Sequence, residues 1–195
     1  MSQIPAAERN KYPIWEIMKN WLSDPYHVFE IGSGLGWHAL QYCQWNPQLI
    51  WQCSEQKQQL EVLKKNVKAF PSPQILTPIE FDVDTAQPYE TYDLVFTVNT
   101  FHIMPLESVE RTLFLAGQMT KAAGRFSVYG PFKYQGQFTT LSNEEFDRYL
   151  KQVDSRRGLR DIETILTMAN SQGFKLLEDH KMPSNNQLLE FIKKG

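Results

Sequence analysis

The residues best suited to bind a ligand form a glycine-rich segment directly behind an apolar stretch. Gly32, Gly34 and Gly36 stand at alternating positions. Ser33 lies between the first two glycines, and Glu30 precedes the first by two positions. Glycine permits a sharp turn and lets a ligand approach the backbone, because no Cβ stands in the way. A helix that follows would present its unpaired N–H groups and positive dipole end to the same ligand.

This segment differs from the fingerprint of dinucleotide-binding proteins. Its spacing is G-x-G-x-G, and Trp37 stands where G-x-G-x-x-G has its third small residue. An acid at Glu30 is badly placed for a pyrophosphate but well placed for a cationic amino acid. S-adenosylmethionine carries both an α-ammonium and a sulfonium, so we expect the segment to bind it. A tight turn between a strand and a helix, with no ligand, is the alternative interpretation.

Length, composition and charge limit the class of protein. The chain has 195 residues, of which 42% are hydrophobic and 22% charged, and this suits one domain over 1–195 with a full core. The formal net charge is -2, with Lys and Arg scattered, which argues against DNA or RNA as a partner. Cys43 and Cys53 indicate two reduced thiols rather than a disulfide framework or a metal site.

Signals for export or membrane insertion are missing from the sequence. The residues up to Lys11 are polar, and no apolar run approaches the length that spans a bilayer. We therefore expect a cytoplasmic protein with no membrane or long nucleic-acid partner and no bound metal. The sequence does not indicate an oligomeric state.

An alternation of strand and helix patterns predicts the elements that position the glycine segment. Helices are expected over 13–22 (with a stop at Ser23-Asp24-Pro25), through Cys43 to Asn46, around 60–67, from Pro105 onward and over 161–172. Strands are expected at 27–31, 49–53, 75–83, 92–98, 125–129, 174–182 and 187–192. The polar segment from about 131 to 158 has no predicted element. This alternation favours a parallel sheet with right-handed crossovers, closed by an antiparallel pair.

The order of elements resembles the class I S-adenosylmethionine-dependent methyltransferase fold. That fold is α/β and Rossmann-like: a doubly wound, mostly parallel seven-stranded sheet of order 3-2-1-4-5-7-6 with a terminal antiparallel hairpin. Its ligands bind where the first and fourth strands end. The resemblance implies that Glu55 accepts the ribose hydroxyls and that Asp82 accepts the adenine amino group. Taken alone, Glu55 is more simply interpreted as a helix N-terminal acid and Asp82 as a loop acid, since acids at helix starts are common.

Several short polar sequences, spread over nearly the whole chain, carry a closer resemblance to one family. They are Ala6-Ala7-Glu8-Arg9-Asn10-Lys11, Glu30-Ile31-Gly32-Ser33-Gly34, Asn99 with His102, Tyr129-Gly130-Pro131-Phe132, Ser142-Asn143 with Asp147, Gly158-Leu159-Arg160-Asp161, and Pro183 with Asn185-Asn186. With them the chain resembles a family of small methyltransferase-like proteins, long catalogued as a domain of unknown function. Membership implies the class I fold and S-adenosylmethionine binding, without a known substrate. The chain departs from the pattern of this family at three positions. Glu55 stands where an aspartate is usual, Trp37 where a small polar residue is usual, and Arg157 where a tryptophan is usual.

Three residues near the strand ends are candidates for the chemistry of methyl transfer. His102 follows the fourth expected strand and is the best-placed general base, which would contribute roughly 10²–10⁴-fold. Asn99 would orient the substrate or hold the cofactor, and Tyr129 would point into the same cleft. With an ordinary histidine pKa of about 6.5, the rate is expected to fall in acid. The alternatives are a structural histidine and a tyrosine packed in the core.

Further candidates lie at the start of the chain and in the polar segment. Residues of about 131–161 are expected to form a lid or substrate collar, with Asn143, Asp147 and Arg160 binding the substrate. The guanidinium of Arg160 would suit an acid. Arg9 and Asn10 are expected before the first helix and would close over the cleft, Asn10 on the cofactor and Arg9 on the substrate. A frayed, exposed terminus is the alternative.

Three functions remain open at this point. The first is an S-adenosylmethionine-dependent methyltransferase acting on a small polar molecule. The second is a protein of the same fold that binds without catalysis. The third is a nicotinamide-dependent oxidoreductase, against which the glycine spacing and Glu30 count. The residues expected to hold the cofactor are Glu30, Gly32, Ser33, Gly34, Gly36, Glu55, Asp82, Asn99 and Asn10.

Overall fold

A seven-stranded sheet forms the centre of the protein, whose computed structural model describes residues 6–22 and 26–195. Its strands are β1 (Tyr26–Ile31), β2 (Leu49–Glu55), β3 (Ile79–Glu80), β4 (Tyr92–Val98), β5 (Thr120–Gly130), β9 (Phe174–Met182) and β10 (Asn186–Lys193). They pair in the order β3-β2-β1-β4-β5-β10-β9. The first five are parallel, and β10 is antiparallel to both β5 and β9. The predicted class I strand order and closing hairpin are confirmed.

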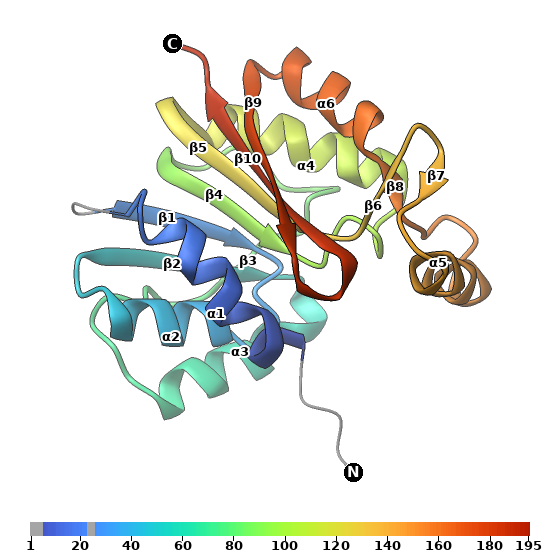
Figure 1. Ribbon diagram of the computed structural model, residues 1–195. Helices are drawn as coiled ribbons and strands as arrows, with labels where there is room; N and C mark the ends of the chain where they lie inside the picture. The colour runs from blue at the N-terminus through green and yellow to red at the C-terminus, as the bar shows by residue number, and fades with distance from the viewer. Residues whose placement is uncertain (1–5, 23–25) are drawn as a thin grey trace.

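Helices cover both faces of this sheet (Figure 1). They are α1 (Ala6–Met18), α2 (Trp37–Trp45) and α3 (Lys57–Ala69) on one face and α4 (Leu106–Met119) and α6 (Ile162–Ser171) on the other, whereas α5 (Leu141–Val153) lies to the side of the sheet. One buried cluster joins the sheet to α1, α2 and α3 through residues such as Ile14 and Leu63. A second joins the other face to α4 and α6 through residues such as Val109 and Ile165. Among the described helices, none is long and apolar enough to cross a bilayer.

The first helix lies earlier than its apolar spacing predicts. In the described residues α1 runs from Ala6 to Met18, so Arg9 and Asn10 belong to the helix instead of preceding it. Alanine and arginine are strong helix formers, and the helix continues through Pro13 although a proline has no N–H to donate. The predicted stop at Ser23-Asp24-Pro25 lies outside the described residues.

The third strand is shorter than the span 75–83 predicted for it. β3 contains two residues, and Ile75 makes only an isolated bridge to β2. Pro78 lies between them, and a proline has no N–H to donate to a sheet. Asp82 therefore lies in a loop beyond the strand, where its carboxylate accepts the backbone N–H of Asp84 at 3.1 Å.

The polar segment after β5 is structured, contrary to the sequence-based expectation. A second, three-stranded sheet contains β6 (Phe132–Tyr134), β7 (Gln137–Phe138) and β8 (Arg160–Asp161), and α5 lies beside it (Figure 1). The buried residues of α5 are Asn143, Asp147 and Leu150. Because two of these three are polar, a search for apolar residues at helical spacing misses the helix.

Candidate functional site

Two adjoining cavities lie where the parallel strands end. The first has a volume of about 430 Å³, is lined by Gly34 and Glu55 among others, and is called here the glycine-loop cavity. The second, about 480 Å³, is lined by His102 and Tyr129 among others and is called the histidine cavity. Asn99 lines both, so they meet at the end of β4. Doubly wound sheets bind ligands at this point, between β1 and β4.

The three glycines of the loop have different tasks. All have a left-handed backbone, with φ between 58° and 75°. A Cβ on Gly32 would lie 2.9 Å from Cγ2 of Thr100, and one on Gly36 would lie 3.1 Å from a methyl carbon of Leu63. These two glycines therefore permit close packing. A Cβ on Gly34 would meet no atom within 4 Å, so this backbone is the part of the loop open to a ligand.

Glu55 connects the glycine loop to the end of β2. Its Oε2 accepts the N–H of Gly34 at 2.8 Å, and its Oε1 accepts the N–H of Gln56 at 2.9 Å. A carboxylate has about four lone-pair sites, so about two remain for a pair of hydroxyl donors. Asp82, expected to bind adenine, is not among the described residues that line this cavity, whereas Asp84 is. Sequence reasoning missed Asp84, since only the loop geometry distinguishes the two acids.

Glu30 lies in the core, beneath the loop. Its side chain is 1% exposed, its Oε2 accepts from Nε1 of Trp51 at 3.1 Å, and its Oε1 lies 3.2 Å from Nδ1 of His38. Nε2 of His38 in turn lies 3.0 Å from Oδ1 of Asn10, which lines the histidine cavity. Ser33 is also internal, since its hydroxyl donates to the carbonyl of Glu30 at 3.3 Å. Glu30 therefore reaches the cavities only through His38 and Asn10.

His102 lies in the wall of the histidine cavity with little access to water. Its ring packs edge-on against Phe146, with 5.3 Å between the ring centroids. Burial, assisted by the positive charge of Arg160, lowers the pKa of His102 to about 4. The imidazole is therefore neutral at pH 7, as a general base must be, but the lowered pKa makes it a weaker proton acceptor than an ordinary histidine. This corrects the expected titration near 6.5, because desolvation disfavours the charged ring.

Acid is expected to destabilise the protein through His102. The unfolded chain protonates this ring near pH 6.5 but the folded chain only near pH 4, so the unfolded state binds more protons between these values. The free energy of unfolding then falls as the pH drops through this window, by about 3 kcal/mol. His102→Asn should remove this part of the pH dependence in urea titrations, and His27→Asn, at an exposed site, should not. An unchanged pH dependence in His102→Asn would contradict a buried neutral imidazole.

Asn99 and Tyr129 lie together at the ends of β4 and β5. The N–H of Asn99 donates to the carbonyl of Tyr129 at 2.8 Å, and Asn99 has a left-handed φ of 59°. Burial raises the pKa of Tyr129 to about 12, against the opposing effects of a hydrogen bond with Asn186 and the charge of Arg9. Its phenol therefore stays protonated at neutral pH and can donate a hydrogen bond but not remove a proton.

Two residues expected to bind the substrate hold the fold instead. Nε of Arg160 donates to the carbonyl of Phe101 at 3.0 Å, and Nη2 donates to the carbonyl of Met104. These bonds fasten the loop that carries the candidate base. Asp147 is buried, and its Oδ1 accepts the N–H of Leu159 at 2.8 Å. Neither Arg160 nor Asp147 is among the described residues lining the histidine cavity.

Replacing Asp147 is expected to affect stability. In Asp147→Ala the buried N–H of Leu159 loses its acceptor and Lys151 loses a carboxylate at 2.7 Å, so we expect a loss of about 1–3 kcal/mol in the free energy of unfolding. Urea denaturation measures it, with Glu145→Ala on the exposed side of α5 as the control. Equal stabilities of the two variants would contradict the structural role.

Asn143 connects the collar segment to the closing hairpin. Its Nδ2 donates to Oγ1 of Thr139 at 2.8 Å and to the carbonyl of Asn185 at 3.0 Å. Asn143 and Asn185 both line the histidine cavity. The segment also contributes Arg156 and Arg157 to the glycine-loop cavity. The segment therefore borders both cavities.

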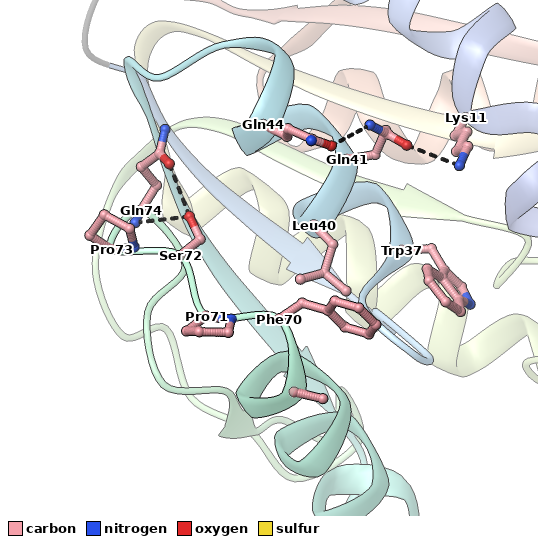
Figure 2. Close-up of a pocket in the computed structure, with 11 residues that line it drawn as sticks. Lys11, Trp37, Leu40, Gln41, Gln44, Phe70, Pro71, Ser72, Pro73 and Gln74 are labelled. Atoms are coloured by element: carbon pink, nitrogen blue, oxygen red, sulfur yellow. Dashed lines mark hydrogen bonds between the residues drawn. The ribbon is translucent and has the colours of Figure 1, made fainter.

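A larger cavity of about 610 Å³ lies away from the strand ends, beside α2 and the chain that follows α3 (Figure 2). Trp37, Leu40 and Phe70 line it, and Nε1 of Trp37 is buried without a hydrogen-bond partner in the described part of the chain. No described lining residue is an acid, histidine or cysteine. Glu55, Asp84 and His102 line the other two cavities instead.

Known proteins share this fold. A family model described as "Protein of unknown function (DUF938)" matches residues 1–193. An O-methyltransferase family protein from Burkholderia thailandensis is 14% identical, with 97% of this chain and 58% of that one covered and a TM-score of 0.84. The mitomycin 7-O-methyltransferase MmcR is 14% identical, with 96% of this chain and 57% of that one covered and a TM-score of 0.76. The S-adenosylmethionine-dependent methyltransferase SibL is 17% identical, with 98% of this chain and 60% of that one covered and a TM-score of 0.73. At these identities the likeness establishes the fold, and this chain spans less than two thirds of each protein's length.

Proposed function

We propose that this chain, which belongs to the DUF938 family of proteins of unknown function, is an S-adenosylmethionine-dependent methyltransferase acting on a small polar molecule. The observation that carries the proposal is the junction of two cavities at Asn99. One contains the open backbone of Gly34 beside Glu55, and the other contains the neutral imidazole of His102. Ligands on the two sides of Asn99 would bring a methyl donor next to its acceptor.

The glycine-loop cavity suits S-adenosylmethionine part by part. Phe81, Val83 and Ile103 line it and offer apolar surface to a purine ring. The lone pairs of Glu55 that the backbone leaves unused suit the two ribose hydroxyls. The open backbone at Gly34 admits a ligand without a clash. The cofactor named for SibL, which shares the fold, supports the same assignment.

The residues at the junction would divide the work of methyl transfer. When bound, S-adenosylmethionine supplies an electrophilic methyl group on a positively charged sulfur. Alignment of the acceptor with that group is worth several kcal/mol, and Asn99 lies where it can orient both molecules. His102 would accept the proton that the acceptor loses, on a nitrogen of its neutral ring. The protonated phenol of Tyr129 would donate a hydrogen bond to the acceptor.

Transfer of an isotopically labelled methyl group tests this function. The protein is incubated with S-adenosylmethionine labelled in its methyl group and with a cell extract from which macromolecules have been removed. We expect a small metabolite to gain the label, and Gly34→Val to prevent it. Cofactor binding without labelling of any small molecule would favour the non-catalytic binding protein, and labelling of protein or RNA in whole extract would contradict the proposed substrate class.

A further inference from the structure

The wall of the histidine cavity has a one-sided charge. Arg9 lines it, and no aspartate or glutamate is among its described lining residues. His102 adds no charge at neutral pH, because burial keeps its ring neutral. The other polar lining residues include five asparagines: Asn10, Asn99, Asn143, Asn185 and Asn186. A guanidinium and several amides, with no carboxylate among the described lining residues, suit an anion better than a cation.

Two acids on the neighbouring helices each lie against a cation of their own helix. Glu8 lies 2.9 Å from Nζ of Lys11 on the same face of α1, and Glu144 lies 3.4 Å from Arg148 on α5. Glu30 lies deeper, against His38.

Contacts with α2 hold Arg9 at the cavity by fixing the helix that carries it. The hydroxyl of Tyr42 donates to the carbonyl of Lys11 at 2.7 Å, and Nζ of Lys11 donates to Oε1 of Gln41 at 3.0 Å. One residue from Arg9, the side chain of Asn10 contacts His38 at 3.0 Å. α1 is thus fixed next to the cavity, which reduces the conformational freedom that binding through Arg9 would cost.

The backbone of the same wall is strained. The described chain has five non-glycine residues with positive φ, and three of them line this cavity: Asn99 at 59°, Ser184 at 58° and Asn185 at 57°. Such conformations are uncommon for residues other than glycine, and they concentrate at active and binding sites. This observation indicates a ligand site independently of charge.

We propose that the histidine cavity binds a carboxylate and that Arg9 recognises it. A guanidinium can bind a carboxylate through two parallel hydrogen bonds, which gives geometric selectivity as well as charge. The sequence favoured Arg160 for this role, but its guanidinium is bound to backbone carbonyls. The inference rests on the proposed function, and it leaves two sources for the carboxylate. One is the methyl acceptor, which would then be a small organic acid, and the other is the amino-acid part of S-adenosylmethionine reaching past Asn99.

Two ligands related to the cofactor test whether Arg9 binds the carboxylate of the cofactor. S-adenosylhomocysteine has the amino-acid part, and 5′-methylthioadenosine lacks it. If Arg9 binds the cofactor's carboxylate, Arg9→Gln should weaken S-adenosylhomocysteine roughly ten- to hundredfold by calorimetry and leave 5′-methylthioadenosine unchanged. Arg9→Lys, which keeps the charge without the paired geometry, should lose less. Arg148→Gln on the exposed side of α5 is the matched control and should alter neither ligand.

Matched pairs of acids and amides test whether Arg9 binds the carboxylate of the methyl acceptor. In the presence of S-adenosylhomocysteine, melting temperatures are measured with 4-hydroxybenzoate against 4-hydroxybenzamide and with lactate against lactamide. If the acceptor is the acid, at least one acid should raise the melting temperature where its amide does not, and Arg9→Gln should lose this shift while keeping its affinity for S-adenosylhomocysteine.

The inference is overturned if Arg9→Gln changes neither the affinity for S-adenosylhomocysteine nor any acid-specific shift. It is also overturned if Arg9→Gln lowers the affinities for S-adenosylhomocysteine and 5′-methylthioadenosine equally, since that result assigns Arg9 a purely structural role. A wild-type protein that binds neither ligand would instead contradict the proposed function.

Discussion

Gly34→Val is expected to abolish binding of S-adenosylmethionine and S-adenosylhomocysteine. The backbone of Gly34 has a φ of 58° and faces open cavity, so a branched side chain would occupy the space of the ligand and resist the turn. The N–H of Gly34 also fixes Glu55 at 2.8 Å, so a displaced loop would lose the proposed ribose acceptor as well. Calorimetry should detect no binding where the wild type binds at about micromolar affinity, a loss of at least two orders of magnitude.

A valine at another left-handed glycine separates strain from loss of the site. Gly136 has a φ of 74° in the turn between β6 and β7, and a Cβ there would meet no atom closer than 4.0 Å. Gly136→Val should therefore lower the melting temperature to a similar extent and keep cofactor binding. If Gly34→Val binds S-adenosylhomocysteine like the wild type, the ligand does not occupy the glycine-loop cavity.

His102→Ala is expected to lower kcat by roughly 10²–10⁴-fold, with little change in cofactor affinity. The reason is the loss of a neutral, buried proton acceptor in the wall of the histidine cavity. Because burial sets the pKa of His102 to about 4, the wild-type rate should stay independent of this group from about pH 5 to 8 and fall only near pH 4. Single-turnover rates across pH measure both effects once an acceptor is identified.

A second histidine controls for general effects of the substitution. His180 lies on β9, where Nε2 contacts Glu190 at 3.1 Å, and it does not line either cavity among the described residues. His180→Ala should keep kcat. If His102→Ala keeps the wild-type rate and pH profile, His102 has no part in proton transfer. If its melting temperature and cofactor affinity fall together without a specific loss of rate, the histidine is structural.

The sheet could be predicted from sequence because its signals are local. Near-continuous apolar runs mark β1 and β4, and alternating helices imply a parallel order. The errors occur where a local pattern is interrupted or overridden. Pro78 shortens β3, strong helix formers before Pro13 extend α1, and buried polar residues such as Asn143 conceal α5. The first two errors come from local residue preferences that apolar spacing does not record, and the third comes from tertiary burial of polar side chains.

The site was only partly predictable because residue type does not fix the direction of a side chain. Gly34, Glu55, Asn99 and His102 all lie on the cavities, as expected from their positions after strands. The acid of the glycine motif instead turns inward to a tryptophan and a histidine that are distant in sequence. The guanidinium of Arg160 is bound to loop carbonyls, a packing contact that no spacing rule reveals.

Calorimetric titration of the wild-type protein with S-adenosylhomocysteine, compared with NAD, tests the central claim most directly. We predict saturable binding of S-adenosylhomocysteine at about micromolar affinity, a stabilisation of about 2.7 kcal/mol at a hundredfold excess over Kd, and no binding of NAD. Absence of heat with millimolar S-adenosylhomocysteine, or tighter binding of NAD, would contradict the assignment of the glycine-loop cavity to a methyl-donor cofactor.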